Sequence, residues 1–243
     1  MVVAHRGSSG AAPENTMAAF RMAVEAGADM LEFDIRLTRD RVPVVHHDRR
    51  LGRTSNGSGR VHDLTFDQIR TFDAGGWFAR RFRGEKIPSL REVLRAFPAS
   101  VGMNIEAKTD GDTRRRAGLA EALLYAIDES GRGPSLIVSS FDHVFLRRLH
   151  RRSPVIRIGA LYLPVRDTLR SPASVARRVG ASVFICSRSQ LRRRHVRDAH
   201  AHQIAVAAYG VNTPADLAVM QRAGVDAVIT DHPGRIVRAL RSA

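Results

Sequence analysis

The sequence predicts an α/β fold, a (β/α)8 TIM barrel with a small insertion after the second strand. Two observations lead to this prediction. Short runs of apolar, often β-branched residues alternate with longer amphipathic stretches, as in a parallel sheet whose strands are joined by helices. Eight such pairs occur in 243 residues, a length that suits a closed barrel. A doubly wound open sheet is the alternative, because a miscount of one strand would lead to it.

Each predicted strand is apolar nearly throughout, as strands buried on both faces should be. The predicted strands cover residues 2–4, 30–35, 102–107, 136–139, 156–161, 182–186, 204–208 and 227–230. The predicted helices cover residues 15–26, 90–97, 114–129, 142–150, 172–179, 191–200, 214–223 and 233–240. Proline opens two of these helices, at Pro214 and Pro233, where its missing N–H is not needed. Glycine follows three helix ends, where a left-handed residue is favoured, at Gly27, Gly180 and Gly224.

The segment 48–88 breaks the alternation. It is rich in Gly, Asp and Arg, and it contains at most one short helix, near residues 65–72. An extended segment at 42–46 precedes it. We interpret the segment as an insertion within a single domain that spans residues 1–243. In a barrel of this kind, insertions between a strand and the next helix lie over the active face.

The chain carries 39 Lys and Arg against 24 Asp and Glu, a net charge of +15. All of the basic residues except Lys86 and Lys108 are arginine. Such an excess can mark a surface for nucleic acid, anionic lipid or phosphorylated substrates. The alternative is an arginine bias in composition. Short, scattered clusters without interleaved aromatic residues favour this bias, so we predict no nucleic-acid partner.

Composition excludes several classes of protein. The single cysteine, Cys186, excludes an internal disulfide framework and a cysteine-based zinc cluster. No apolar run approaches the length of about 20 residues that a membrane span requires, and the start of the sequence shows no signal peptide. We therefore expect a cytoplasmic protein without stable membrane insertion, either a monomer or a small homo-oligomer.

Polar residues gather where the first strands of the predicted barrel end. Parallel barrels place catalytic side chains at such ends. Glu32 and Asp34 lie two residues apart on the second strand, so both point to one face. The other candidates are His5 and Arg6 after the first strand, His46, His47 and Asp48 after the extended segment, and Glu106 and Lys108 at the third strand.

The carboxylates of Glu32 and Asp34 indicate a binding site for a metal cation. Two carboxylates side by side in an apolar strand repel each other and lose hydration. A divalent cation would remedy both effects, and Glu106 could supply a third oxygen. Such an oxygen-only set suits Mg²⁺ or Ca²⁺ rather than zinc. The alternative is a structural cluster in which Arg6 or Arg36 pairs with the carboxylates.

Each histidine also has a structural interpretation. His47 can hydrogen-bond to Asp48 within a loop, and His5 can be a buried histidine without chemistry. The convergence of two histidines, an arginine, a lysine and three carboxylates on one predicted rim favours an active site instead.

Seven sequence motifs occur in order along the chain. They are HRGSSGAAPENT at 5–16, EFDIRLTRD at 32–40, VPVVHHDRRLGRTSNGSG at 42–59, IPSLREVL at 87–94, NIEAK at 104–108, SSF at 139–141 and GVDAVITDHP at 224–233. In order and spacing, over essentially the whole chain, they resemble the motifs of the glycerophosphodiester phosphodiesterase family.

This resemblance implies a TIM barrel with a small insertion, in agreement with the strand count. It also implies roles for the residues that match the family's motifs. The implied catalytic residues are His5 and His47, the implied metal ligands are Glu32, Asp34 and Glu106, the residues implied to contact the phosphate are Arg6 and Lys108, and Glu14, Asn15 and Thr16 match a motif that shapes the site. The family has one histidine before the aspartate, so His47 is the match and His46 should face away.

The sequence departs from the family at the seventh strand. A Trp-Thr-Val-Asn-like stretch is replaced there by Tyr209-Gly210-Val211-Asn212. These positions are expected to line the alcohol end of the substrate pocket, so Tyr209 is a candidate substrate-binding residue.

The resemblance implies a metal-dependent phosphodiesterase that hydrolyses glycerophosphodiesters, such as glycerophosphocholine or glycerophosphoethanolamine, to glycerol phosphate and an alcohol. It also implies that a glycerol hydroxyl attacks first and that water then opens a cyclic phosphate. The polar insertion and the 6% content of aromatic residues favour a soluble substrate. Two alternatives remain. One is lysophospholipase D or sphingomyelinase-D-like hydrolysis of a lipid, with Trp77 and Phe78 as an apolar rim, and the other is an inactive phosphate- or nucleic-acid-binding module.

Overall fold

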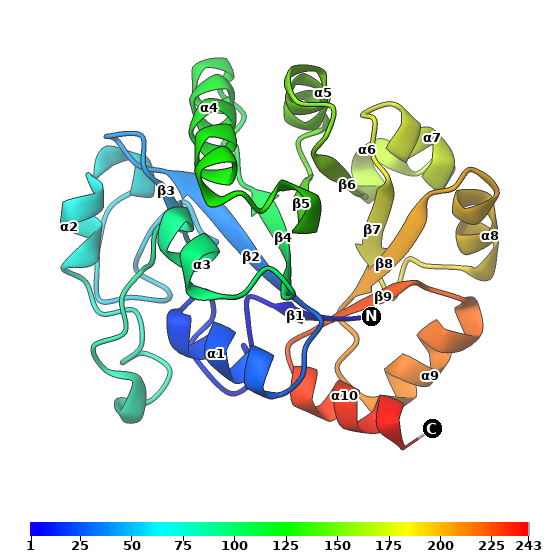
Figure 1. Ribbon diagram of the computed structural model, residues 1–243, viewed down its shortest axis with the longest axis horizontal. Coiled ribbons are helices and arrows are strands. Elements are labelled where there is room, and N and C mark those ends of the chain that lie inside the picture. The colour runs from blue at the N-terminus through cyan, green and yellow to red at the C-terminus, as the bar shows by residue number, and fades with distance from the viewer. Residues whose placement is uncertain (243) are drawn as a thin grey trace.

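Eight parallel strands close into a barrel in the computed structural model, which describes residues 1–242 (Figure 1). In order around the ring, the strands are β1 (Val2–His5), β2 (Met30–Leu37), β4 (Gly102–Ala107), β5 (Leu136–Ser140), β6 (Arg157–Leu161), β7 (Val183–Ser187), β8 (Ala205–Tyr209) and β9 (Ala227–Thr230). β1 pairs in parallel with both β2 and β9, which closes the ring. The predicted TIM barrel is confirmed, and the open-sheet alternative is wrong because the first strand is paired on both sides.

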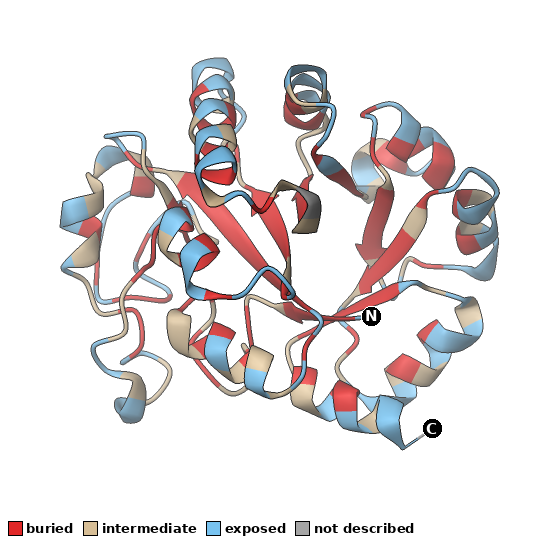
Figure 2. Cartoon of the chain, in the orientation of Figure 1, coloured by how far each residue is buried: buried red, intermediate tan, exposed pale blue. Residues whose placement is uncertain are grey.

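Helices surround the ring and cover its outer face (Figure 1). They are α1 (Met17–Glu25), α3 (Leu90–Ala96), α4 (Thr113–Ser130), α5 (His143–Arg152), α7 (Pro172–Arg177), α8 (Arg193–Ala201), α9 (Pro214–Ala223) and α10 (Pro233–Arg241). Figure 2 shows buried strands at the centre and helices that combine buried and exposed positions. Within residues 1–242, no helix has both the length and the apolar character that crossing a membrane requires.

Apolar side chains fill two regions of the barrel. The larger lies between the strands and the helices, where the rings of Phe20 and Phe33 pack with centroids 5.5 Å apart. The smaller includes Met30, Ile137 and Ile185, which project from the strands into the barrel. Toward the carboxyl ends of the strands, polar side chains replace these apolar ones.

The strand register decides which polar side chains are neighbours. His5 of β1 pairs with Glu32 of β2, and Asp34 of β2 pairs with Glu106 of β4. Glu106 in turn pairs with Ser139 of β5. Because alternate residues of a strand share a face, these side chains project into the barrel near its carboxyl end.

Most predicted elements are present, with ends shifted by one or two residues. α1 begins at Met17 rather than at residue 15, because Thr16 is its N-cap and accepts the N–H of Ala19. Asn15 therefore lies outside the helix, in a left-handed conformation with a φ of 60°. α8 likewise begins two residues later than predicted, at Arg193.

The sequence predicts one group of local features correctly and misses one short helix. The predicted left-handed glycines are confirmed, with φ values of 82°, 69° and 85° at Gly27, Gly180 and Gly224. The sequence does not predict α6 (Pro164–Asp167), which lies between β6 and α7. Four residues are too few to show a helical period.

The predicted insertion lies between β3 (Pro43–Val45) and α3. β3 pairs antiparallel with β2 outside the ring. The helix predicted near residues 65–72 corresponds to α2 (Phe66–Arg70), which begins after a capping box formed by Thr65 and Gln68. Two 3₁₀ turns, η1 (Val61–Asp63) and η2 (Arg80–Phe82), complete the insertion. Its own small core joins it to β3 and consists of Val44, Leu51, Val61, Ile69, Ala74 and Ile87.

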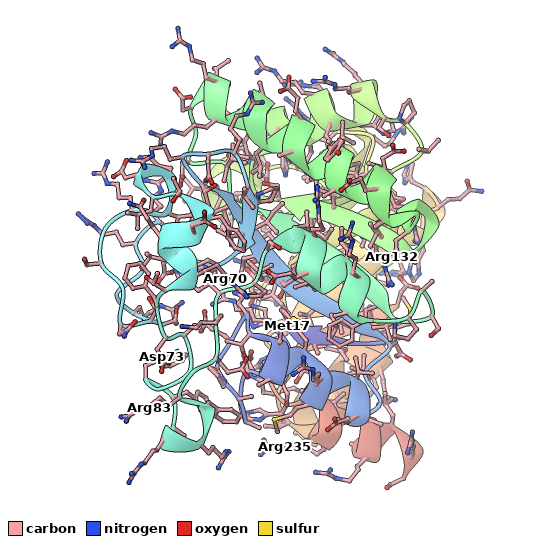
Figure 3. The ribbon with its side chains drawn as sticks, turned by 60° about the vertical axis from the view of Figure 1, so that its left-hand side comes forward. Met17, Arg70, Asp73, Arg83, Arg132 and Arg235 are labelled. Atoms are coloured by element: carbon pink, nitrogen blue, oxygen red, sulfur yellow. The ribbon has the colours of Figure 1, made fainter. Side chains whose placement is uncertain are left out.

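The carboxylate of Asp73 organises the tip of the insertion, residues 73–84 (Figure 3). Its Oδ1 accepts the N–H groups of Gly75 and Gly76 at 2.8 and 2.7 Å, and its Oδ2 accepts the N–H of Gly84 at 2.8 Å. The chain folds so tightly here that a Cβ at Gly75 would lie 1.9 Å from the carbonyl oxygen of Phe82. Glycine is therefore required at this position.

A buried arginine joins two connections at the amino end of the barrel. Arg132, which follows α4 and is labelled in Figure 3, is 6% exposed. It donates hydrogen bonds to the carbonyl oxygens of Phe97 and Val101, both at 2.6 Å. These two residues lie in the connection between α3 and β4. Charged donors make strong hydrogen bonds, and buried carbonyl groups that lose their donors destabilise a fold.

Replacing Arg132 with Ala should lower the free energy of unfolding by about 3 kcal/mol, since two buried carbonyl groups lose charged donors. The control is Arg95→Ala, at an exposed position of α3, which should change it by less than about 0.5 kcal/mol. Urea unfolding followed by circular dichroism measures both values. Equal stability of the two variants would contradict this role of Arg132.

Candidate active site

A cavity of about 250 Å³ lies at the carboxyl end of the barrel. All predicted site residues except Asp34 line it, namely His5, Arg6, Glu32, His47, Glu106, Lys108 and Tyr209. Asp34 is fully buried beside Arg6 and Lys108. The rest of the lining consists of two polar residues and four apolar ones, namely Asn104, Ser139, Phe141, Leu161, Ile185 and Ile229. The structure thus brings the predicted residues together.

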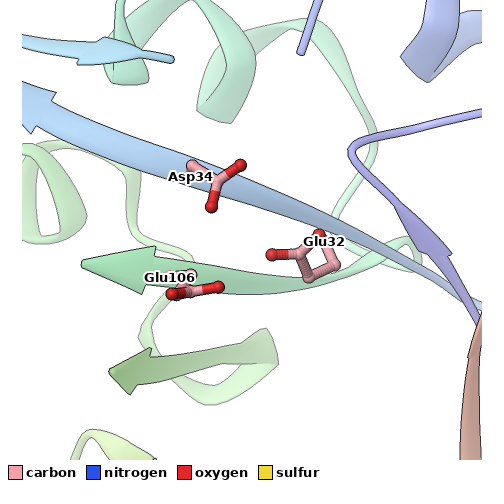
Figure 4. A group of neighbouring side chains, drawn as sticks. All are labelled: Glu32, Asp34 and Glu106. Carbon is pink, nitrogen blue, oxygen red and sulfur yellow. The ribbon is translucent and has the colours of Figure 1, made fainter. Parts of the chain in front are cut away.

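Glu32, Asp34 and Glu106 form a buried acidic group (Figure 4). One carboxylate oxygen from each residue lies within 4.8 Å of the others. Figure 4 shows Glu32 and Asp34 on one strand, with Glu106 on the strand beside it. Three carboxylate oxygens at this spacing can hold a divalent metal ion.

Burial and mutual repulsion shift the pKa values of these carboxylates. Burial, together with the charge of Asp34, raises the pKa of Glu32 to about 7, and the same two causes raise the pKa of Glu106. Burial acts on Asp34 in the same direction, but Lys108 and Arg6 outweigh it and hold its pKa well below the usual range. A cation bound between the carboxylates would offset the burial and the repulsion that raise the pKa of Glu32. The residues therefore fit a metal ion.

Two basic side chains contact the acidic group. Lys108 Nζ lies 3.0 Å from Asp34 Oδ1 and also hydrogen-bonds to Glu106. Arg6 Nε lies 3.1 Å from Asp34 Oδ2. The backbone of Arg6 is left-handed, with a φ of 55°, and its N–H donates to Glu32 Oε2 at 3.0 Å. The arginine pairing considered from the sequence is thus present for Arg6, at the wall of the cavity.

The other arginine considered as a partner, Arg36, does not contact the acidic group. It pairs with Asp110 at 2.6 Å and donates to the carbonyl oxygen of His47 at 2.8 Å. The Arg36 alternative is therefore wrong. Asn15 supports the group instead, because its Nδ2 donates to Asp34 Oδ2 at 2.9 Å.

An aspartate holds each of the two histidines that line the cavity. His5 Nδ1 lies 2.7 Å from Asp231 Oδ1, and His47 Nδ1 lies 2.6 Å from Asp48 Oδ1. His5 Nε2 lies 4.0 Å from Glu32 Oε2. When Nδ1 carries the proton that the aspartate accepts, Nε2 is the basic atom of a neutral ring. Both rings are therefore oriented as proton-transfer groups need to be.

The surroundings shift the pKa values of the two histidines in opposite directions. Burial by itself lowers the pKa of His5, but the hydrogen bond to Asp231 and the charge of Glu32 outweigh burial and raise it. Burial lowers the pKa of His47, and the charge of Lys108 acts in the same direction. The two rings are therefore electrostatically distinct.

Three other positions considered from the sequence lie outside the cavity. His46 faces away, as predicted: it is buried, and its Nε2 lies 3.2 Å from the carbonyl oxygen of Arg50. Trp77 and Phe78 pack edge to face in the insertion, with ring centroids 5.6 Å apart, and neither lines the cavity.

Known proteins resemble this chain over nearly its whole length. A model of the glycerophosphoryl diester phosphodiesterase family matches residues 5–235. The chain belongs to this family. A glycerophosphodiester phosphodiesterase from Caldanaerobacter subterraneus subsp. tengcongensis is 36% identical over 99% of this chain and 98% of its own length. One from Bacillus altitudinis is 31% identical over 98% of this chain and 96% of its own.

Solved structures share the fold. An Oleispira antarctica phosphodiesterase in complex with the product sn-glycerol-3-phosphate has a TM-score of 0.90 and 27% identity, covering 99% of this chain and 96% of that one. A glycerophosphodiester phosphodiesterase from Agrobacterium tumefaciens has a TM-score of 0.85 and 29% identity, covering 98% of both chains. The predicted resemblance is confirmed, and membership of the family makes the chain a phosphoric diester hydrolase.

The sequence did not identify Asp231 as a site residue of this phosphodiesterase. Besides holding His5, Asp231 accepts hydrogen bonds from Asn212 Nδ2 at 2.7 Å and from the hydroxyl of Ser9 at 3.1 Å. The hydrogen bond to His5 is the main cause that holds the pKa of Asp231 well below its usual range. The signal was present, because Asp231 directly follows β9 and the same criterion selects Glu106.

Only one residue of the stretch 209–212 lines the cavity of this family member. Tyr209 does so, whereas Gly210 has a φ of 81° and turns the chain away. Val211 is buried in the outer core, and Asn212 hydrogen-bonds to Asp231. Of the two positions at which the sequence departs from the family, Tyr209 lines the cavity, and its contact with the alcohol end of a substrate stays a prediction.

Glu32→Gln should stabilise the metal-free protein relative to wild type at pH 8 and have little effect at pH 5. The folded pKa of about 7 lies above the ordinary value of 4.5, so the folded state binds the proton more tightly than the unfolded state. Wild type therefore loses stability as the pH rises through this range, whereas glutamine has no charge to bury. The expected difference at pH 8 is about 1–3 kcal/mol.

Urea unfolding in the presence of EDTA at both pH values measures this difference. Glu25→Gln, at an exposed position of α1, is the control, and its difference in stability from wild type should be small and the same at both pH values. A difference between Glu32→Gln and wild type that stays constant from pH 5 to pH 8 would contradict the prediction.

Proposed function

We propose that the chain hydrolyses water-soluble glycerophosphodiesters, such as glycerophosphocholine and glycerophosphoethanolamine, to glycerol phosphate and an alcohol. One observation carries the proposal: an acidic group, two aspartate-held histidines and two basic side chains meet at one cavity in a barrel of this family. The named activity of its relatives supports the substrate class, as does the sn-glycerol-3-phosphate in the Oleispira antarctica structure.

Glu32, Asp34 and Glu106 are the proposed ligands of one divalent cation, Mg²⁺ or Ca²⁺. Their spacing, their burial and the raised pKa of Glu32 support this assignment. A cation bound there would act as a Lewis acid that neutralises charge on the phosphate. Oxygen-only ligands suit both ions.

Arg6 and Lys108 are the proposed phosphate-binding residues. Both line the cavity, and their side chains are 16% and 14% exposed, so water screens them little. Preorganised positive charge in such a site stabilises the negative charge that develops on the phosphate oxygens during the reaction. Their contacts with Asp34 fix both side chains before the substrate binds.

His5 and His47 are the proposed proton-transfer groups. One takes the proton from the attacking glycerol hydroxyl, and the other gives a proton to the oxygen of the leaving alcohol. The attack forms a cyclic phosphate of glycerol and releases the alcohol. In the second step water opens the cyclic phosphate, and the two histidines exchange roles. Asp231 and Asp48 keep the rings oriented through both steps.

The cavity suits a small polar substrate. Asn104 and Ser139 belong to its lining, and neither Asn104 Oδ1 nor the Ser139 hydroxyl has a hydrogen-bond partner within residues 1–242. Buried polar groups nearly always have a hydrogen-bond partner, so a hydroxylated ligand or water is expected to form the missing hydrogen bonds. The cyclising step also requires a free hydroxyl beside the phosphate, which a glycerophosphodiester has and a diacyl phospholipid lacks.

A substrate panel tests the function and the metal together. Glycerophosphocholine, glycerophosphoethanolamine, lysophosphatidylcholine and bis(p-nitrophenyl) phosphate are compared by kcat/KM, with Mg²⁺ and with Ca²⁺. A chelator should abolish hydrolysis, and one of the two ions should restore it. A glycerophosphodiester should exceed lysophosphatidylcholine by at least tenfold, about 1.4 kcal/mol. A tenfold preference for lysophosphatidylcholine would replace this proposal with the lipid alternative, and activity in a chelator would end the metal assignment.

His5→Ala and His47→Ala should each lower kcat for glycerophosphocholine by about 10²–10⁴-fold, because each removes a positioned proton-transfer group. Circular dichroism should show an unchanged fold. His202→Ala, at an exposed position after α8, is the control and should keep the wild-type rate. Wild-type turnover in either cavity variant would refute the pairing.

A further inference from the structure

The turn that contains α6 exposes apolar side chains and buries a charged one. Val165 and Leu169 are 97% and 100% exposed, and Leu163 is 38% exposed. Asp167, in the same turn, is only 2% exposed. Single exposed apolar residues are common on protein surfaces, but this turn exposes a group of them while it buries a carboxylate.

Hydrogen bonds hold the turn in this orientation. Asp167 Oδ2 accepts the N–H of Leu163 at 3.0 Å, and Asp167 Oδ1 accepts Arg166 Nε at 2.9 Å. Arg166 Nη1 donates to the carbonyl oxygen of Phe141 at 2.6 Å, and its Nη2 lies 2.9 Å from His143 Nε2. The charged side chains thus attach the turn to the barrel, and the apolar side chains are left facing solvent.

The turn lies at the rim of the cavity. It follows β6, whose last residue, Leu161, lines the cavity, and Phe141, which accepts from Arg166, lines it too. β6 pairs with β7, so the loop that follows β7 is its neighbour at the same end of the barrel. Figure 1 shows α6 on the side of the barrel formed by these two strands.

The segment after β6 and the segment that runs from the end of β7 into α8 are both strongly basic. Residues 162–171 and 187–197 contain a single acidic residue, the buried Asp167. Their seven arginines are Arg166, Arg170, Arg188, Arg192, Arg193, Arg194 and Arg197. The side chains of Arg192, Arg193 and Arg194 are exposed where α8 begins. Arg166 and Arg170 pair with Asp167, and Arg188 pairs with Asp216. The arginines where α8 begins therefore supply the positive charge that accompanies the exposed apolar side chains at this rim.

We propose that this rim, residues 162–171 and 187–197, docks on the surface of an anionic lipid bilayer. Val165 and Leu169 would enter the interface, and Arg193 and Arg194 would contact the head groups. Charge decides the occupant: two copies of a chain with a net charge of +15 repel each other, whereas anionic lipid attracts it. The proposal concerns binding and goes beyond the reaction proposed above.

Vesicle sedimentation of the full chain tests the apolar part. Wild type should bind vesicles of phosphatidylcholine mixed with phosphatidylglycerol at least tenfold better than vesicles of phosphatidylcholine alone. Val165→Ser/Leu169→Ser, which removes apolar surface without adding charge, should lower the partition coefficient at least tenfold. The matched control is Val155→Ser, which is 84% exposed between α5 and β6 at the opposite end of the barrel and should bind like wild type.

A second pair of variants tests the charged part. Arg193→Gln/Arg194→Gln should weaken binding to the mixed vesicles and reduce its dependence on salt. Arg177→Gln/Arg178→Gln removes the same charge from exposed positions where α7 ends, at the opposite face, and should bind like wild type. Equal loss of binding in both pairs would mean that only total charge matters, and it would overturn the proposed surface.

The remaining outcomes are also decisive. The proposal is overturned if Val165→Ser/Leu169→Ser binds mixed vesicles as tightly as the unchanged protein does. It is also overturned if the unchanged protein does not bind these vesicles. Concentration-dependent dimerisation that only this double variant loses would assign the rim to a second copy instead. Every variant should hydrolyse glycerophosphocholine at the wild-type rate. If wild type binds vesicles but does not hydrolyse this diester, the proposed function fails while the docking surface stands.

Discussion

Three carboxylates are buried side by side inside the barrel, and the rest of the site depends on this constraint. Glu32, Asp34 and Glu106 occupy paired strands, so strand register determines their spacing. Buried charges destabilise a fold unless opposite charges compensate them. Arg6 and Lys108 compensate Asp34 directly, and Glu32 is left as the carboxylate that resists ionisation. The cation proposed above would compensate the remaining charge, and together with Arg6 and Lys108 it would favour a phosphate.

Closure of the barrel completes the site. The pairing of β1 with β9 brings Asp231 to His5, across 226 residues of chain. Two non-glycine residues near the start of the chain, Arg6 and Asn15, adopt left-handed backbones, and both contact Asp34. Such conformations cost about 1–3 kcal/mol each and persist only where surrounding contacts hold them. The contacts that form when the barrel closes therefore also hold the site residues in place.

What the sequence predicts well depends on local periodicity. The apolar runs identify the strands, and the two-residue spacing of Glu32 and Asp34 correctly places both side chains inside the barrel. The features that the sequence does not predict depend on contacts that leave no repeating pattern in the sequence. The partnership of Asp231 with His5 appears only when the ring closes, α6 is too short to show a repeat, and the turn at Gly210 redirects the chain. Chemistry at strand ends is thus more predictable than the residues that support it.

The arginines of this chain have different surroundings in the structure. A bias in composition would scatter arginine over all faces, and many positions agree with that, including Arg132, whose buried guanidinium has a purely structural role. The segments 162–171 and 187–197 differ because the only acidic residue within them is the buried Asp167, and Asp216 of α9 pairs with one of their arginines, Arg188. Asp167, the one acidic residue there, turns inward to bind Arg166 and so leaves the apolar side chains outside. The net charge is a sum over the whole chain, so only the structure shows where arginines are exposed beside apolar side chains, as at Arg193 and Arg194.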